Sequence, residues 1–312
     1  MSFWLSVLLF AVGIVLLIKG GDWFVDSASW IARAANIPPF VIGATIVSIA
    51  TTLPEMIVSV MASLEGKNDM AVGNAVGSVS ANIGLILALA FVFLPVVAPR
   101  EKYLKQCLIL IATAVVLWVG SLGGTVKLWA TAALAALFVL FTATLIVDAK
   151  KEPVTEDKPD CSRKEVARYI LFFVVGAAAI VLGSNLLIDG GSSIAASLGV
   201  PERVIAVTMV AIGTSLPELI TTITAIRKKQ ANLSAGNIIG ANIIDLALIL
   251  PVCSLVSGSS FSVSAASLAI DFPVCFALIL IAMVPMLVKE RAYKIQGLIL
   301  LICYAAYVVF TV

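Results

Sequence analysis

Residues 48–57 read SIATTLPEMI and residues 211–220 read AIGTSLPELI, so one pattern occurs twice in this chain of 312 residues. The same offset aligns residues 20–87 with residues 183–250 without a gap. Roughly a third of the aligned positions match, which is far more than two unrelated apolar stretches would show. The sequence therefore predicts a molecule built from two related halves.

The composition is that of a membrane protein. Hydrophobic residues make up 61% of the chain and charged residues only 12%, with a mean hydropathy of +1.13. Soluble proteins carry about twice as much charge. Apolar runs of about 20 residues recur from end to end, and each is long enough to cross a hydrocarbon core of about 30 Å. The first run lacks the basic start and cleavage site of a signal peptide, so it is interpreted as a membrane helix.

Charged residues, Pro and Gly divide the apolar runs into ten predicted helices. These cover residues 3–18, 38–64, 70–95, 104–121, 127–148, 166–187, 201–226, 233–256, 264–288 and 293–311. A polar stretch with two prolines predicts a solvated linker over 149–165. Residues 1–148 and 166–312 then form two halves of five helices each. Because five is odd, the second half enters from the opposite face, so we expect an all-α membrane protein of two inverted five-helix repeats.

The basic residues predict the orientation of these helices. If both termini lie outside, only Lys67, Lys127 and Arg203 of the 20 basic residues fall in outside segments. A bias this large follows the positive-inside rule and supports an even number of spans. The linker is then cytosolic.

Each copy of the repeated motif places a glutamate directly after a proline within a predicted membrane helix. Pro54 and Pro217 lack a backbone N–H, so a carbonyl in the preceding turn loses its helical partner. Carboxylates buried in a bilayer cost roughly 2.5 kcal/mol or more and indicate a functional site by default. The predicted spans offer Glu55 and Glu218 no neighbouring Lys or Arg, so we expect both side chains to be protonated or to bind a cation.

Hydroxyl and amide side chains accompany the glutamates. Thr51 precedes Glu55 by one helical turn, as Thr214 precedes Glu218, so each pair shares a helix face. The next helix of each half adds residues that line one face, namely Asn74, Ser78 and Asn82 in the first half and Asn237, Ala241 and Asp245 in the second. Clusters of carboxylate, hydroxyl and carbonyl oxygens suit hard cations such as Na⁺ and Ca²⁺.

Two glycine pairs lie beside this polar face. They are Gly73 with Gly77, and Gly236 with Gly240. Small residues at this spacing let helices approach closely, so we expect them to bring the polar walls together.

Other acidic residues have an ordinary interpretation. Asp22, Asp26 and Asp189 lie near predicted helix ends, where we expect them to be solvated or packed against loops. Asp271 lies outside the repeat and receives no role.

The paired motifs resemble those of the sodium/calcium exchanger branch of the cation/calcium exchanger superfamily, in its prokaryotic form. TTLPE with GNAVGSVSANIGL and GTSLPE with GNIIGANIIDLAL correspond to the two α-repeats of that family, over about 43–89 and 206–250. The resemblance implies an antiporter that exchanges several Na⁺ for one Ca²⁺ by alternating access. It implies a transporter rather than an enzyme, with no catalytic residues and no cofactor.

The resemblance also implies which residues bind the cations. Glu55 and Glu218 should bind both Ca²⁺ and Na⁺, and the carbonyls of Thr51 and Thr214 should help to bind Ca²⁺. The remaining positions implied for the cation sites are Thr52, Ser78, Ser215, Asn82 and Asp245. Ala241 stands where the family usually has serine, which leaves the Na⁺ stoichiometry and the driving ion open. The aspartate at 245 leaves an involvement of K⁺ open.

The expected partners are the transported ions Ca²⁺ and Na⁺ and the lipid bilayer, without nucleic acid, and the chain is expected to act as a monomer. Animal exchangers carry a large cytosolic regulatory domain, for which the linker has no room. We therefore expect a multi-pass protein of a prokaryotic plasma (inner) membrane, with the N- and C-termini outside.

The nearest alternative is a Ca²⁺/H⁺ antiporter of the same superfamily. Those proteins usually carry a glutamate soon after the Gly–Asn dipeptide, and GNAVG and GNIIG lack one. Another divalent ion such as Mn²⁺ stays open, because oxygen ligands serve both ions.

Two further classes fit less well. A channel would use similar acidic groups, but inverted repeats with broken helices favour alternating access. The chain has no histidine, which argues against zinc chemistry and Ser–His hydrolysis, and no GxGD motif of an intramembrane aspartic protease is present.

Overall fold

The computed structural model describes residues 2–93, 99–151, 159–199, 215–257 and 261–311. The chain divides into two compact units, each assembled from separate stretches of sequence. Unit 1 comprises Met1–Thr51 and Ala149–Asn237, and unit 2 comprises Thr52–Asp148 and Ile238–Val312. Each unit therefore contains residues from both halves of the repeat. The division into repeats at 1–148 and 166–312 with a linker at 149–165 stays a prediction.

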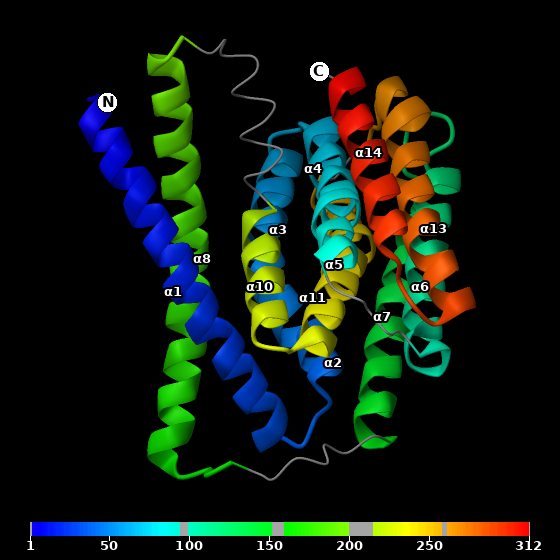
Figure 1. Ribbon diagram of the computed structural model, residues 1–312. Coiled ribbons are helices and arrows are strands. Elements are labelled where there is room, and N and C mark those ends of the chain that lie inside the picture. Colours follow the sequence, from blue (N-terminus) through cyan, green and yellow to red (C-terminus); the bar gives the residue numbers. More distant parts are fainter. Residues whose placement is uncertain (1, 94–98, 152–158, 200–214, 258–260, 312) are drawn as a thin grey trace. The chain divides into compact units, whose positions relative to one another are not determined.

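The described ranges are almost entirely helical (Figure 1). Unit 1 holds α1 (Phe3–Ala34), α2 (Pro39–Ile42), the π-helix η1 (Gly43–Val47), α8 (Arg163–Ser197) and α10 (Leu216–Arg227). Unit 2 holds α4 (Asn68–Ala81), η2 (Asn82–Leu87), α5 (Ala88–Phe93), α6 (Arg100–Gly120), most of α7 (Leu128–Lys151), η3 (Asp245–Ile249), α12 (Leu250–Val256), η4 (Ser267–Asp271), α13 (Phe272–Lys289) and α14 (Lys294–Thr311). Two helices run through both units, α3 (Ser48–Leu64) and α11 (Ala231–Ile244).

The predicted all-α membrane fold is confirmed. Nine stretches of the described residues are long and apolar enough to cross a membrane. They lie at the positions of nine of the ten predicted spans. Much of the remaining one, predicted at 201–226, lies outside the described residues, and α10 forms its C-terminal part. No β-strand occurs in the part of the chain that the structure describes, where Thr125 and Ser262 form an isolated antiparallel bridge.

The predicted end of the first helix at residue 18 is wrong, because α1 continues to Ala34 and has 32 residues. Gly20 and Gly21 are packing residues here rather than helix breakers. A Cβ atom on Gly20 would lie 2.9 Å from the Cβ of Ala179, and one on Gly21 would lie 2.8 Å from Oγ1 of Thr224. At 1.5 Å per residue α1 is about 48 Å long, which exceeds the hydrocarbon core. The sixth predicted helix, 166–187, is likewise extended, because α8 has 35 residues.

Helices α1 and α8 lie side by side and run antiparallel (Figure 1). Near the start of α1, Ser6 Oγ donates a hydrogen bond of 2.8 Å to Ser193 Oγ, close to the end of α8. Further along, a Cβ on Gly13 would lie 2.8 Å from the carbonyl oxygen of Gly183. Near the other end, the rings of Trp30 and Tyr169 stack at 4.5 Å. The repeat alignment makes these two helices equivalent, so their opposite directions are those that an inverted repeat requires.

Asp22 and Asp26 lie inside α1 and form ion pairs with the end of α10, so the predicted position at a helix end is wrong for both, although Asp26 is exposed to solvent as expected. Asp22 pairs with Arg227, and Asp26 accepts a hydrogen bond of 2.7 Å from Lys228 Nζ. The expected helix end is also absent at Asp189, which is exposed on α8. The cause is the same in each case: the helices continue beyond the ends that hydropathy predicted.

In unit 2, α14 packs against η2 and α5. A Cβ on Gly84 would lie 2.5 Å from the Cβ of Tyr304, and one on Gly297 would lie 2.5 Å from the carbonyl oxygen of Ala88. The hydroxyl of Tyr307 donates a hydrogen bond of 2.9 Å to Asp271, the residue that the sequence left without a role. The contact between Gly84 and Tyr304 holds η2, the π-helix that begins at Asn82, against the C-terminal helix.

Candidate cation-binding site

The acidic residues singled out by the sequence are buried. Glu55 on α3 and Asp245 at the start of η3 are each 0% exposed, and Glu218 in the first turn of α10 is 1% exposed. The hydroxyl and amide residues proposed beside them are buried as well, namely Thr51, Thr52, Ser78, Asn82 and Ser215. Thr214 lies outside the described residues. Unit 1 contains Thr51, Ser215 and Glu218. Unit 2 contains Thr52, Glu55, Ser78, Asn82 and Asp245.

Two π-helices begin at equivalent site positions. The first, η2, starts at Asn82, and the second, η3, starts at Asp245, its partner in the repeat alignment. π-Helical turns are rare and occur frequently at functional sites. Hydropathy patterns do not reveal them, because an α-helix and a π-helix of this length have the same apolar composition. The structure thus marks the same two positions that the repeat comparison selected.

In unit 2, Asn74 positions the helix that carries Glu55. Its Nδ2 donates hydrogen bonds to the backbone carbonyl of Glu55, at 3.1 Å, and to Oγ of Ser59, at 2.9 Å. These two bonds tie α4 to α3 beside the carboxylate. The amide nitrogen of Asn74 is thereby occupied, and this side chain positions the turn of α3 that carries Glu55.

Two oxygen atoms in unit 2 are available to a cation. Oγ of Ser78 and Oδ1 of Asn82 are buried and have no hydrogen-bond partner among the described residues. The nitrogen of the Asn82 amide donates a hydrogen bond of 3.0 Å to Oδ1 of Asn242 on α11. Asn82 therefore directs its nitrogen to Asn242 and keeps its oxygen free, which suits a hard cation. The sequence argument missed Asn242 because its equivalent in the first half is a valine, Val79.

In unit 1, Asn237 connects three helices. Thr51 Oγ1 on α3 donates to Oδ1 of Asn237 at 3.3 Å, and Nδ2 of Asn237 donates to Oγ1 of Thr221 at 3.0 Å. Thr221 in turn donates to the carbonyl oxygens of Pro217, at 2.9 Å, and Glu218, at 3.0 Å. The chain of bonds joins the turn that carries Thr51 to the turn that carries Glu218. Sequence reasoning placed Asn237 on the polar face but did not identify it as this bridge.

Close backbone contact holds α11 in this place. A Cβ on Gly236 would lie 2.1 Å from the carbonyl oxygen of Phe40, and one on Gly43 would lie 2.2 Å from that of Leu233. The predicted close approach is confirmed at Gly236. For Gly73 and Gly77 it stays a prediction: a Cβ there would meet no atom within 4 Å among the described residues, and positions 203 and 207, which are equivalent to Phe40 and Ala44, lie outside them.

Both units bring residues of the two repeats together through asparagine. In unit 1 Thr51 of the first repeat meets Asn237 of the second, and in unit 2 Asn82 meets Asn242. Around these contacts the available ligands are carboxylate, hydroxyl and amide oxygens. Such ligands suit Na⁺ and Ca²⁺ rather than soft metals.

The fold and its buried carboxylate, hydroxyl and amide oxygens define a multi-pass membrane protein with carboxylates inside its spans. The family model described as sodium/calcium exchanger protein matches residues 5–147 and 168–312. The chain therefore belongs to the sodium/calcium exchanger family.

Two relatives and one solved structure are similar to this chain over most of its length. The sodium/calcium exchanger MaX1 of Methanosarcina acetivorans is 30% identical over 345 aligned positions, which cover 97% of each chain. The inner membrane protein YrbG of Escherichia coli is 34% identical, with 81% of this chain and 80% of that protein covered. Among solved structures, one of the sodium-calcium exchanger NCX_Mj superimposes with a TM-score of 0.83 at 29% identity, covering 99% of both chains.

Proposed function

We propose that this protein exchanges Na⁺ for Ca²⁺ by alternating access, with Glu55 and Glu218 supplying the shared carboxylates near the middle of the membrane. The remaining ligands in this proposal are Thr51, Thr52, Ser78, Asn82, Thr214, Ser215 and Asp245. The observation that carries the proposal is the burial of Glu55 and Glu218, at equivalent repeat positions, in a chain of the exchanger family. A carboxylate buried in a membrane span is costly, so its presence indicates a functional role.

The proposed mechanism is electrostatic competition for the same carboxylates. One Ca²⁺ or several Na⁺ ions can neutralise Glu55 and Glu218, whereas an empty site leaves two negative charges in a medium of low dielectric constant. Burial of net charge is costly, so the empty transporter reorients poorly and leak is suppressed. If the cycle moves net charge, each elementary charge contributes about 2.3 kcal/mol per 100 mV, so an inside-negative potential favours Ca²⁺ export.

The proposal also covers the orientation, the membrane and the oligomeric state of the protein. The distribution of basic residues supports a linker on the cytosolic side and both termini outside. We assign the chain to a plasma (inner) membrane, where the inner membrane protein YrbG supports the placement, and to a monomer that uses no cofactor.

The test is ⁴⁵Ca²⁺ uptake into Na⁺-loaded proteoliposomes that are diluted into Na⁺, K⁺ or choline buffer. Uptake is expected only in the two Na⁺-free buffers, because an outward Na⁺ gradient drives it. Equal uptake in K⁺ and choline would exclude K⁺ as a co-substrate. Uptake that does not depend on Na⁺ but depends on an imposed pH gradient would contradict the proposal and favour a Ca²⁺/H⁺ antiporter.

Ala241 provides a test of the sodium sites. It is 0% exposed on α11 and occupies the position at which the family usually has serine. Ala241→Ser adds one hydroxyl oxygen, so we expect the Na⁺ concentration for half-maximal Ca²⁺ release to fall about threefold or more, with a steeper Na⁺ dependence. The control is Ala178→Ser on the exposed face of α8, which should leave the Na⁺ dependence unchanged. An unchanged curve for Ala241→Ser would remove position 241 from the sodium sites.

A further inference from the structure

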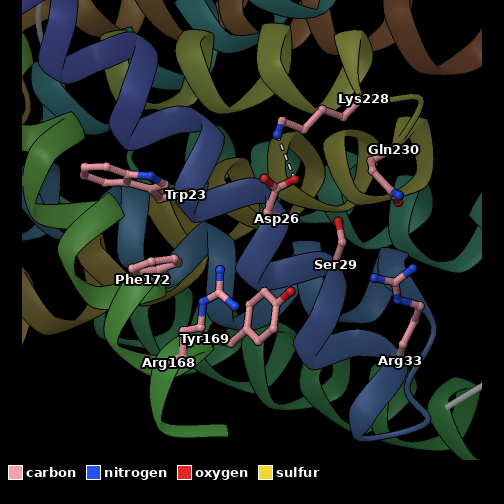
Figure 2. Close-up of a pocket in the computed structure, with 9 residues that line it drawn as sticks. All are labelled: Trp23, Asp26, Ser29, Arg33, Arg168, Tyr169, Phe172, Lys228 and Gln230. Carbon is pink, nitrogen blue, oxygen red and sulfur yellow. Dashed lines mark hydrogen bonds and ion pairs between the residues drawn. The ribbon is translucent and has the colours of Figure 1, made fainter. Parts of the chain in front are cut away.

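A pocket of about 410 Å³ opens within unit 1 between α1, α8 and the end of α10 (Figure 2). None of the proposed cation ligands lines it. Its lining includes three cationic side chains, Arg33, Arg168 and Lys228, and one carboxylate, Asp26, which gives a net charge of +2. The volume lies in the range of ligand-binding pockets. The excess of positive charge favours an anionic ligand.

Arg168 presents hydrogen-bond donors to this pocket. Its guanidinium lies 5.8 Å from the ring centre of Tyr169 and 5.4 Å from that of Phe172. Its contact with Glu165 is 3.6 Å long, which is beyond a hydrogen bond. Cation–π contacts with the two rings hold the guanidinium while leaving its N–H donors for an anion, and a guanidinium matches two phosphate oxygens at once.

Two further side chains lie where they can contact a ligand oxygen, Ser29 and Lys228. Ser29 is only 8% exposed, and its Oγ has no hydrogen-bond partner in the part of the chain that the structure describes. Figure 2 shows this hydroxyl beside Asp26 in the pocket. Lys228 lies across from it and bonds Asp26 at 2.7 Å. A buried hydroxyl without a partner is uncommon, so a ligand oxygen here would complete the hydrogen bonding of Ser29.

The aromatic side chains indicate that the pocket lies at the level of lipid headgroups. Trp23 stacks on Phe172 with ring centres 6.0 Å apart, and Trp30 stacks on Tyr169 at 4.5 Å. Trp and Tyr concentrate at membrane–water interfaces. In the orientation proposed above, this interface is the cytosolic one. Basic pockets between membrane helices on that side recognise anionic phospholipid headgroups.

We propose that this pocket binds the phosphate group of an anionic phospholipid of the cytosolic leaflet. Arg168 and Arg33 contact the phosphate oxygens, Ser29 donates a hydrogen bond, and the rings of Trp23 and Phe172 border the glycerol and the upper acyl chains. The phosphate competes with Asp26 for Lys228 and thereby weakens the ion pair that joins α1 to α10. None of the proposed cation ligands lines this site. A test of phospholipid binding therefore gives a result that does not depend on whether the protein exchanges Na⁺ for Ca²⁺.

The experiment is native mass spectrometry of the full chain in detergent, titrated with short-chain phosphatidylglycerol. The wild type is expected to retain one lipid, and Arg168→Gln is expected to weaken binding about tenfold or more, since charge-assisted hydrogen bonds are lost. The control Arg163→Gln removes the same charge from an exposed position on α8 outside the pocket, and its affinity should equal that of the wild type. Arg33→Gln is the second pocket variant and should also weaken binding.

Two competitors identify the source of the phosphate. Phosphatidylcholine, whose headgroup has no net charge, should compete at least about tenfold more weakly than phosphatidylglycerol. Inorganic phosphate should not displace the lipid at equal concentration. Equal retention by the Arg163 and Arg168 variants would overturn the pocket assignment. Displacement by inorganic phosphate at equal concentration would overturn the assignment to a lipid.

Discussion

Glu55→Gln is expected to lower Na⁺-driven Ca²⁺ uptake by at least about 100-fold. Glutamine keeps the shape of the side chain but cannot neutralise a cation, and the loss of one charge from a buried pair typically costs 3–5 kcal/mol. Glu218→Gln should have the same effect, because its carboxylate occupies the equivalent position of the second repeat and is equally buried. Initial rates of ⁴⁵Ca²⁺ uptake in proteoliposomes measure both variants.

The melting temperature distinguishes a variant that has lost a cation-binding side chain from one that has misfolded. The neutral glutamine avoids the burial of a charge, so the melting temperature of Glu55→Gln without ions should equal or exceed that of the wild type. The wild type alone should gain stability from added Ca²⁺, because a ligand that binds the native state raises its melting temperature. A Glu55 variant that melts normally and still transports within threefold of the wild-type rate would remove this residue from the cation site.

Glu65→Gln is the matched control for Glu55→Gln. Glu65 lies exposed between α3 and α4, and its hydrogen bond of 2.7 Å from Lys67 lowers the pKa of the Glu65 carboxyl. The same exchange of residue types there removes a charge that faces solvent. Exposed ion pairs contribute little to stability, so both uptake and melting temperature should stay at wild-type values.

Gly236→Ala is expected to lower the melting temperature by roughly 6–12 °C. The added methyl group would lie 2.1 Å from the carbonyl oxygen of Phe40 and 2.9 Å from the amide nitrogen of Ala44, so α11 has to move away from α2 and η1. Overpacking against backbone costs about 3 kcal/mol, and each kcal/mol corresponds to about 2–4 °C in a chain of this size. Thermal unfolding in detergent, followed by fluorescence, measures the shift.

The sign of the shift makes this prediction decisive. Alanine favours an α-helix over glycine by about 1 kcal/mol, so a loose contact at this position would raise the melting temperature instead. The control Ala231→Val adds apolar volume to the exposed start of α11 and should change the melting temperature by less than about 2 °C. Transport by Gly236→Ala should fall as well, because the displacement of α11 breaks the bond between Thr51 and Asn237.

The class of fold and the location of the site could be predicted from the sequence because both depend on local or repeated properties. Apolar length alone predicts the membrane spans, and nine of them recur in the described residues. Repetition of the glutamate motif selected Glu55 and Glu218, and the structure buries both. The same comparison of the two repeats selected Asp245 as a site residue, although its equivalent in the first repeat is the uncharged Asn82.

The predicted helix ends were wrong where one residue type, glycine, can either end a helix or let another helix pack closely. The first helix is predicted to end at residue 18, just before Gly20 and Gly21, yet these glycines allow α1 to continue and to pack against α8 and α10. The misplaced helix end put Asp22 and Asp26 beside a loop, whereas they lie inside α1 and pair with Arg227 and Lys228. Whether a glycine ends a helix or admits a neighbour depends on what faces it, and hydropathy carries no information about the facing helix.

The sequence by itself determined that this chain crosses the membrane many times, carries an inverted repeat and buries a pair of glutamates. Only the tertiary structure decided that Asn237 bridges Thr51 to Thr221 and that Asn82 meets Asn242. It also decided that Arg168 and Ser29 share a pocket. The physical reason is that burial follows from the transfer energy of each segment, which can be summed along the chain. A hydrogen bond requires two atoms within about 3 Å, and for segments far apart in sequence that distance exists only once the helices have packed.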